Sequence, residues 1–143
     1  MRNYLLFFLI LVVFSCGPKK PVGEQPVKSE TLLPAEALQF ETESHDFGIL
    51  KAGEKTSFSF VFTNSGDQPI QIKNVNPDCG CLSVRFDNKP VKPGEKGMIE
   101  VIFDSAGEFG RQLKNIEIEW NSKELKHLII FAEVENDQLI INN

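Results

Sequence analysis

The sequence has few of the residues on which most enzymes depend. Its 143 residues include two histidines, three cysteines, one tryptophan and one tyrosine. It contains no G-x-S-x-G or H-E-x-x-H motif, no P-loop and no dinucleotide-binding fingerprint. We therefore predict that the protein is not an enzyme and that it uses no cofactor.

Long apolar runs and basic charge are also scarce. The longest apolar run, residues 5–14, has ten residues, whereas a membrane-spanning helix needs about 20. Lys and Arg number 15 against 20 Asp and Glu, which gives a net charge of −5 at pH 7. Nucleic acid and anionic lipid both attract basic surfaces, so this charge balance argues against either as a direct ligand.

The start of the chain has the layout of an export signal. Arg2 precedes the apolar run, as in secretory signal peptides. The run ends in VFSC at residues 13–16, which resembles the lipobox of bacterial lipoproteins, although its first two residues replace the usual leucine and small residue. We predict that residues 1–15 are a lipoprotein signal peptide and that Cys16 carries the lipid.

The segment that follows the signal predicts a tether. Residues 16–37 comprise the lipidated cysteine and a stretch rich in proline, glycine and charge, which cannot bury a core. As a flexible coil, this length of chain spans about 25 Å root-mean-square. We expect the domain in the bacterial cell envelope, anchored to a membrane through the lipid, and facing the periplasm or the cell surface.

Residues 38–143 are long enough for one domain, and their hydrophobic pattern has a period of two. Phe58, Phe60 and Phe62 share one parity while serine and threonine take the other, which is typical of a half-buried strand. Residues 126–134 are apolar at both parities, as expected of a central strand covered on both faces. Alternating runs also occur near residues 46–48, 70–72, 82–86, 99–103 and 116–120. About seven short strands and no helical period predict an all-β fold, an antiparallel β-sandwich.

Three short motifs give local predictions. Pro93-Gly94 is typical of a type II turn with a positive φ at the glycine. Residues 64–67 indicate a hairpin-type connection. Phe47 should pack inward, and Gly48 should allow a close approach of another backbone segment.

Several motifs occur together in one known family. In chain order they are HDFGI at 45–49, GEK at 53–55, FVFTNSG at 60–66, CGC at 79–81, PGEKG at 93–97 and WN at 120–121. From about residue 43 to residue 121 the chain resembles the bacterial family called domain of unknown function 1573. The resemblance implies an immunoglobulin-like sandwich related to ASPM, SPD-2 and Hydin domains, commonly exported and often lipid-anchored, with no established activity. Family members usually have serine and threonine around CGC, where this chain has Asp78 and Leu82.

Cys79 and Cys81 are the candidate functional pair. If Cys16 is lipidated, these two cysteines remain in the domain, in an oxidising compartment where thiols tend to pair. If the strand at 82–86 extends backwards in register, both side chains lie on the face opposite Leu82. Gly80 permits the bend that a disulfide between residues i and i+2 needs. Our leading interpretation is a structural disulfide, or apposed thiols without chemistry, that contributes little to stability.

Three alternatives stay open for the pair. Two thiolates suit Cu(I) or Zn²⁺, but a closed zinc site needs four ligands, and beyond carboxylates the chain offers His45 and His127. Thiol–disulfide exchange is the second alternative, although no helix N-terminus is predicted to lower a thiol pKa. Bonding between two chains is the third.

Two classes of function follow. The leading prediction is a lipid-anchored cell-envelope module, protein-binding or structural, whose partner is an unidentified envelope protein. The alternative is a protein that handles copper or zinc, or exchanges thiols and disulfides, through Cys79 and Cys81.

Overall fold

The structure is a computed structural model that describes residues 34–135. These residues form two four-stranded sheets packed face to face, so the predicted all-β sandwich is confirmed. The elements are η1 (Ala35–Ala37, a 3-10 helix), β1 (Leu38–Phe40), β2 (Ser44–Lys51), β3 (Lys55–Asn64), β4 (Ile72–Pro77), β5 (Leu82–Phe86), β6 (Lys96–Asp104), β7 (Gly110–Trp120) and β8 (Lys126–Glu135). The strand that the sequence does not predict is β1, whose three residues are too few to show an alternation.

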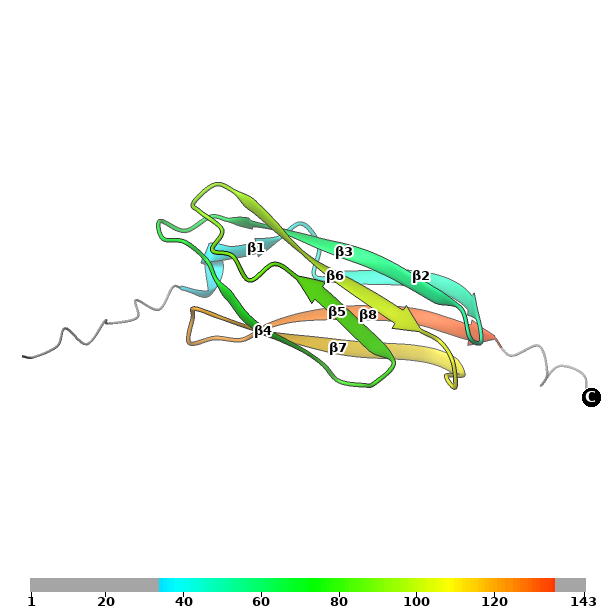
Figure 1. Cartoon of the computed structure of the whole chain (residues 1–143). Coiled ribbons are helices and arrows are strands. Elements are labelled where there is room, and N and C mark those ends of the chain that lie inside the picture. Colours follow the sequence, from blue (N-terminus) through cyan, green and yellow to red (C-terminus); the bar gives the residue numbers. More distant parts are fainter. Residues whose placement is uncertain (1–33, 136–143) are drawn as a thin grey trace, which may run out of the picture.

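The two sheets have the strand orders β1-β3-β6-β5 and β2-β8-β7-β4. All pairings are antiparallel except that of β2 with β8, which is parallel. The described chain begins at η1, at one end of the sandwich, and leaves after β8 at the other end (Figure 1). The predicted tether therefore joins the domain at the η1 end.

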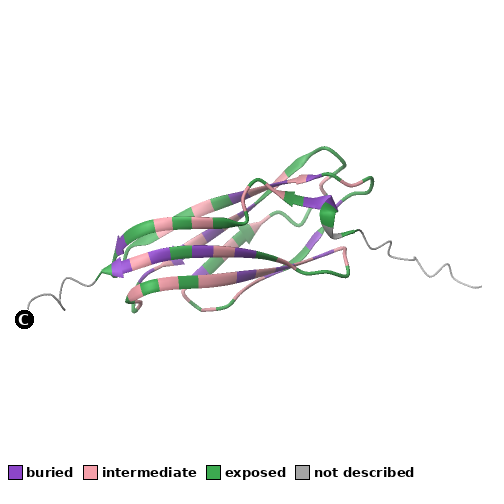
Figure 2. Cartoon of the chain, turned by 180° about the vertical axis from the view of Figure 1, so that it is seen from behind, coloured by how far each residue is buried: buried purple, intermediate pink, exposed green. Residues whose placement is uncertain are grey.

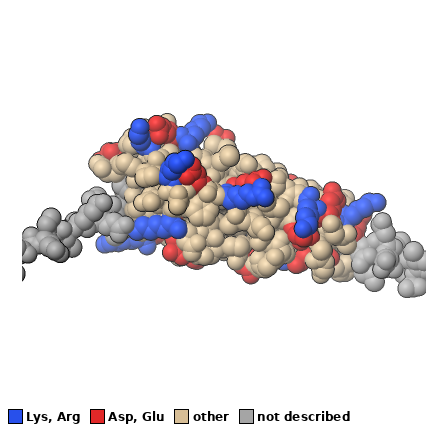
Figure 3. Space-filling view, viewed as in Figure 1, with Lys and Arg blue, Asp and Glu red and all other residues tan. Residues whose placement is uncertain are grey.

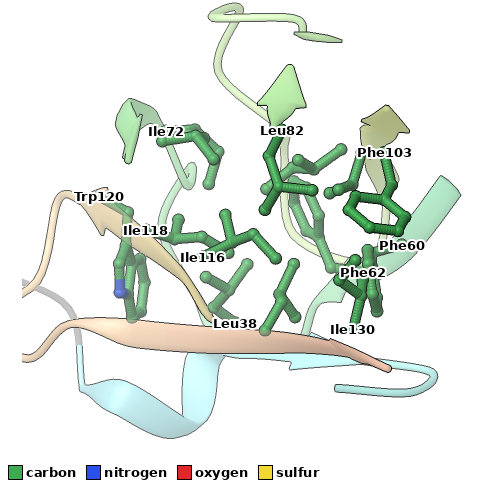
Figure 4. Packing of buried hydrophobic residues seen from close by; sticks show 14 of the residues in the cluster. Leu38, Phe60, Phe62, Ile72, Leu82, Phe103, Ile116, Ile118, Trp120 and Ile130 are labelled. Carbon is green, nitrogen blue, oxygen red and sulfur yellow. The ribbon is translucent and has the colours of Figure 1, made fainter. Parts of the chain in front are cut away.

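The core lies between the sheets and is built from alternate residues of both. Phe60 is fully buried and Phe62 is 2 % exposed, as their parity predicts. Side chains from the two sheets meet there in one cluster (Figure 4). Phe58 is partly buried, because it lies at the margin of the sandwich, where its ring stacks on that of His45 with centroids 3.7 Å apart.

β8 is a central strand, as predicted, but it is covered on one face only. Leu128, Ile130 and Val134 are buried, whereas Phe131 is 37 % exposed. Figure 2 shows this alternation of burial along the strands. The prediction that both faces are covered is therefore wrong for the described residues, and the outer face of the second sheet presents apolar side chains to solvent.

The three local motifs have different outcomes. Gly94 has a φ of 79°, and Glu95 N–H donates to the Lys92 carbonyl at 3.0 Å, so the type II turn is confirmed. The connection at 64–67 is no hairpin, because it leads from β3 in the first sheet towards β4 in the second. Gly48 has a φ of 71° at a register shift of β2, and nothing lies within 4 Å of where its Cβ would be, so the predicted close approach is wrong.

Several predicted features lie outside the described residues. These are Cys16, the signal peptide at 1–15, nearly all of the tether and the last residues of the domain, 136–143. Within residues 34–135, no helix is long and apolar enough to cross a membrane.

Candidate functional site

Cys79 and Cys81 lie in the connection from β4 in the second sheet to β5 in the first. They form a disulfide with Cα atoms 5.2 Å apart, within the usual range for such bonds. Hydrogen bonds fix this turn to both sheets. Asp104 N–H of β6 donates to the Cys81 carbonyl at 2.9 Å, and Asn115 N–H of β7 donates to the Asp78 carboxylate at 2.7 Å. The disulfide therefore sits in a crossover that is held independently at each end.

The two cysteine side chains are partly buried against the edge of the core. The sequence places them on the opposite face, with Ser83 and Arg85, on the assumption that β5 extends backwards in register. That assumption is wrong because residues 79–82 form a turn, in which Leu82 N–H approaches the Cys79 carbonyl at 3.4 Å. The turn reverses the alternation, so strand parity does not apply before Leu82.

The two histidines occupy different surroundings. His45 of β2 stacks on Phe58 of β3 and meets the Phe47 ring edge-on at 4.7 Å, so it helps to close the margin between the two sheets. His127 of β8 is exposed, and its Nδ1 lies 3.4 Å from the side-chain nitrogen of Asn115. In residues 34–135, no group of three or more His, Cys, Asp or Glu side chains is placed to hold a metal ion. The copper or zinc alternative therefore gains no support from this arrangement.

The thiol-redox alternative also lacks a supporting feature. A reactive cysteine is usually activated by a helix N-terminus or a neighbouring cation, which lowers its pKa. The described residues contain no α-helix, and the main-chain partners of the cysteine turn come from strands. The pair has a structural place in the fold, at the point where the chain changes sheets.

A groove that the sequence does not predict lies beside the start of β6. Its volume is about 860 Å³. β5 stops at Phe86, opposite Ile99, whereas β6 begins three residues before Ile99, at Lys96. One wall is the segment 86–91 and the other is the beginning of β6. The apolar lining residues are Phe62, Phe86, Pro90, Val91 and Met98.

The groove exists because the chain, which runs beside β6 as far as the last residue of β5, Phe86, then turns away from β6. Val91 exchanges two main-chain hydrogen bonds, of 2.7 and 2.9 Å, with Ile70, which lies in the connection from β3 to β4. Asn64, which is 1 % exposed, donates its side-chain amide to the carbonyls of Val91 and Gln68, both at 2.8 Å. A buried amide left without partners would cost about 1–3 kcal/mol, so Asn64 fixes the path of the segment that forms the wall.

The first residues of β6 direct unpaired main-chain groups into this groove. In an antiparallel ladder these groups point alternately to the two neighbouring strands. Asn64 N–H donates to the Glu95 carbonyl at 3.0 Å, so odd-numbered residues of β6 bond to β3, and the Asp104 N–H shows that even-numbered ones face β5. The N–H and C=O of Lys96 and Met98 therefore face the place where β5 has already ended. Because the β5–β6 ladder ends at the pair Phe86–Ile99, it provides no partner within residues 34–135 for either main-chain group of Lys96 or for the N–H of Met98.

The groove has an open rim and a packed base. Met98 is 61 % exposed at the rim. Gly97, the residue before Met98, has no side chain, and the buried ring of Phe62 fills the place that a Cβ would take.

Charges at the rim are paired with one another. Arg85 lies 3.4 Å from Glu100, and Lys89 lies 3.3 Å from Asp87. The Asp87 carboxylate also accepts the N–H of Lys89 at 2.9 Å, and this bond is the main cause that holds the pKa of Asp87 below its usual value. Figure 3 shows acidic and basic side chains interspersed on one face of the molecule. The groove therefore offers a ligand main-chain hydrogen bonds and apolar contacts, and its paired charges do not create an electrostatic potential of one sign.

The sequence did not predict the groove, because the groove depends on where β5 ends relative to the start of β6 and no motif encodes that difference. Two signals are present in the sequence. Three of the four residues after β5, namely Asp87, Asn88 and Pro90, are turn formers that end the strand early. Met98 is a second signal, since it is a large apolar residue at an outward position of β6.

Comparison with solved structures shows the same fold in distant proteins. A protein of unknown function from Porphyromonas gingivalis W83 is 23% identical with a TM-score of 0.60, over 74% of this chain and 51% of that chain. The ASH / PapD-like domain 7 of human CEP192 is 11% identical with a TM-score of 0.59, over 83% and 99%. SSP-19 of Caenorhabditis elegans, an MSP-domain protein like family member, is 9% identical with a TM-score of 0.54, over 67% and 99%.

These likenesses establish an immunoglobulin-like fold and nothing about activity. The chain spans about half of the Porphyromonas gingivalis protein, with 51% of it covered. No curated protein matches the chain. The motifs quoted above from residues 45–121 lie inside a longer match, over residues 38–134. On that match, which covers more than half of its length, the chain belongs to the family described as Protein of unknown function (DUF1573).

Proposed function

We propose that the protein is a lipid-anchored module of the bacterial cell envelope that binds a partner protein and catalyses no reaction. The observation that carries this proposal is the open edge of β6 beside the groove, at Lys96 and Met98. Unpaired N–H and C=O groups along a strand edge are a template for another extended chain. Such strand addition derives affinity from main-chain hydrogen bonds and specificity from pockets for alternate side chains.

The groove suits an extended segment of a partner better than a small charged ligand. Its rim charges already neutralise one another, as in the pairs Arg85–Glu100 and Lys89–Asp87. A partner strand beside β6 would place apolar side chains against Phe86, Val91 and Met98. The partner should therefore present an alternating segment with a free N–H at each paired position, which excludes proline there.

The proposed anchor places this groove near the membrane. The tether would run from Cys16 to η1, where Ser65 N–H at the end of β3 donates to the Ala37 carbonyl at 2.9 Å. The start of β6 lies beside the same end of β3, because Thr63 pairs with Lys96. A partner in or on the same membrane would thus meet the groove at the tethered end of the sandwich. This placement supports an envelope protein as the partner.

Site-specific crosslinking in intact cells tests the proposal. A photo-crosslinking amino acid in place of Lys89, on the groove wall, should give a discrete protein adduct, and the same amino acid in place of Lys123 should not. Met98→Pro removes the main-chain N–H that faces the groove, so it should abolish the adduct, whereas Met98→Ala keeps the N–H and should retain it. Thermal melts of both variants check that they are folded. An adduct that persists in a folded Met98→Pro variant would exclude strand addition at this edge.

A further inference from the structure

β3 has an open edge along the part of the strand that β1 does not cover (Figure 1). β1 pairs with residues 62–64 of β3, and one further bond, from the Glu41 N–H to the Val61 carbonyl at 2.9 Å, continues this pairing. The chain then crosses to the second sheet, where β2 pairs with β8. In the part of the chain that the structure describes, residues 55–59 of β3 therefore have β6 on one side and no strand on the other.

The main-chain groups of Ser57 and Ser59 point to this open side. The odd-numbered residues of β6, which bond to β3, lie opposite even-numbered residues of β3. Main-chain groups of an antiparallel strand point alternately to its two neighbours, so those of odd-numbered residues of β3 face away from β6. The strand pairings of residues 34–135 provide no partner on that side for Lys55, Ser57 or Ser59.

The other sheet edges carry features that hinder the addition of a strand. β2 has a register shift with Gly48 at a φ of 71°, and β4 has a register shift and ends in Pro77. β1 has three residues and β5 has five. β3, in contrast, pairs with β6 without a register shift, and its open stretch carries small side chains at Ser57 and Ser59. A regular strand edge without such protection is a template for another strand.

From this edge we propose that two copies of the protein pair antiparallel through β3, about a twofold axis at Ser57, and join their first sheets into one continuous sheet. Ser57 then lies opposite the same residue of the second copy, and Lys55 of each copy lies opposite Ser59 of the other. Each of these pairs exchanges two main-chain hydrogen bonds, as in any antiparallel ladder. The dimer thereby satisfies the main-chain groups that the isolated sandwich leaves open.

The charges at this edge favour the antiparallel arrangement. Lys55, at one end of the open stretch, pairs with Asp104 at 2.8 Å, and Glu41, just beyond the other end, pairs with Lys96 at 2.6 Å. Both pairs lie on the same face of the sheet, because Lys96 and Asp104 are even-numbered residues of β6. Antiparallel pairing places Lys55 of each copy two positions from Glu41 of the other, with Cα atoms about 7 Å apart. Parallel pairing would instead bring the two Lys55 side chains together.

A second β3 also continues the pattern of the first. Phe58 is partly buried at the margin of the sandwich, where it stacks on His45, and Phe47 meets the His45 ring edge-on. In the proposed register, Thr56 of the second copy lies opposite Phe58 on the inner face. Aromatic and β-branched side chains form favourable cross-strand pairs. The added strand therefore extends both the apolar inner face and the serine-bearing outer face, which makes a second copy a fitting occupant.

Disulfide trapping tests the twofold axis. The mature chain carries Cys16→Ser so that it can be handled without lipid, together with Ser57→Cys. Residues of a hydrogen-bonded pair have Cα atoms about 5.5 Å apart, within the range for a disulfide. We expect a covalent dimer on mild oxidation, with a link between the two positions 57 found by peptide mass spectrometry.

Ser83→Cys is the matched control for trapping. Ser83 is also exposed and lies opposite the same residue, Ile102, on the other side of β6. It should give little covalent dimer, because β5 is not the proposed contact. Equal trapping at both positions, or no link between the two positions 57, would overturn the proposal.

Sedimentation equilibrium measures the reversible association. With Cys16→Ser alone, the average mass should rise from one chain towards two between about 1 and 100 µM, as expected of a small interface. Ser57→Pro removes an N–H that faces the open side and should weaken association about tenfold or more, whereas Ser57→Ala keeps it and should associate like the parent chain. Thermal melts check that both variants are folded.

Two results would contradict the dimer. One is a parent chain that is monomeric at about 100 µM, and the other is a folded Ser57→Pro variant that associates as strongly as Ser57→Ala. These experiments use no partner protein, and they leave unchanged the groove, which lies on the opposite side of β6. Their outcome is therefore independent of the proposed partner binding.

Discussion

Replacing both Cys79 and Cys81 by serine should cost the domain little stability. In the chain-entropy description, a bond that closes a three-residue loop restricts the unfolded chain by about 5.4 cal/mol/K, or about 1.6 kcal/mol at 25 °C. The hydrogen bonds that hold the turn do not depend on sulfur, because the Cys81 carbonyl and the Asp78 carboxylate still accept from β6 and β7. We therefore expect a loss of about 1.5 kcal/mol or less, below the typical 2–4 kcal/mol for a disulfide.

Urea denaturation followed by far-UV circular dichroism measures this difference. The midpoint should fall while the slope m stays the same, because the amount of buried surface is unchanged. Wild-type protein with a reduced disulfide should behave like the double variant, which separates the bond from the change of side chain. A loss of more than about 3 kcal/mol, or a changed slope, would refute the view that the crossover is held independently of the disulfide.

Four further changes have defined outcomes. Phe60→Ala should cost about 3–5 kcal/mol in urea denaturation, because the ring is fully buried, and a loss below about 1 kcal/mol would contradict its place in the core. Gly97→Ala should cost about 1–3 kcal/mol in the same assay, since the added methyl meets a buried ring at the base of the groove. The hydrogen bond from Lys55 is the main cause that lowers the pKa of Asp104, so the carboxylate stabilises the fold at neutral pH, and this contribution is lost as the pH falls below about 4. The difference in free energy of unfolding between wild type and Asp104→Asn should shrink over that range. A difference that grows on acidification would contradict a stabilising role for the Asp104 carboxylate. Cys16→Ser should move the protein from the membrane to the soluble fraction, and an unmodified Cys16 in the mature chain would contradict lipidation.

The strand pattern could be predicted where side chains alternate between core and solvent. β3 is the clearest case, since Phe60 and Phe62 face the core at the predicted parity. The pattern failed at β8, where Phe131 is apolar but faces outwards. Periodicity reports which positions are apolar, and it cannot distinguish a second covered face from an apolar surface left for another contact.

The candidate sites also show what a local sequence pattern cannot predict. The sequence singled out Cys79 and Cys81 as a pair, but their side chains pack against the edge of the core and do not follow the predicted strand parity, because the alternation ends where the chain turns. The groove depends on the side-chain amide of Asn64, whose partners at Gln68 and Val91 are 4 and 27 residues away along the chain. No local pattern encodes such a contact, so the early end of β5 beside β6 becomes visible only in the fold.

Amide hydrogen exchange at the start of β6 tests the central claim most directly. The N–H groups of Lys96 and Met98 face the open side, whereas those of Gly97 and Ile99 face β3. In the purified, partner-free domain we predict that Gly97 and Ile99 exchange slowly, as paired strand residues do, and that Lys96 and Met98 exchange at rates typical of exposed loops. Equal protection of all four amides would mean that this edge is already paired and would contradict strand addition in the groove.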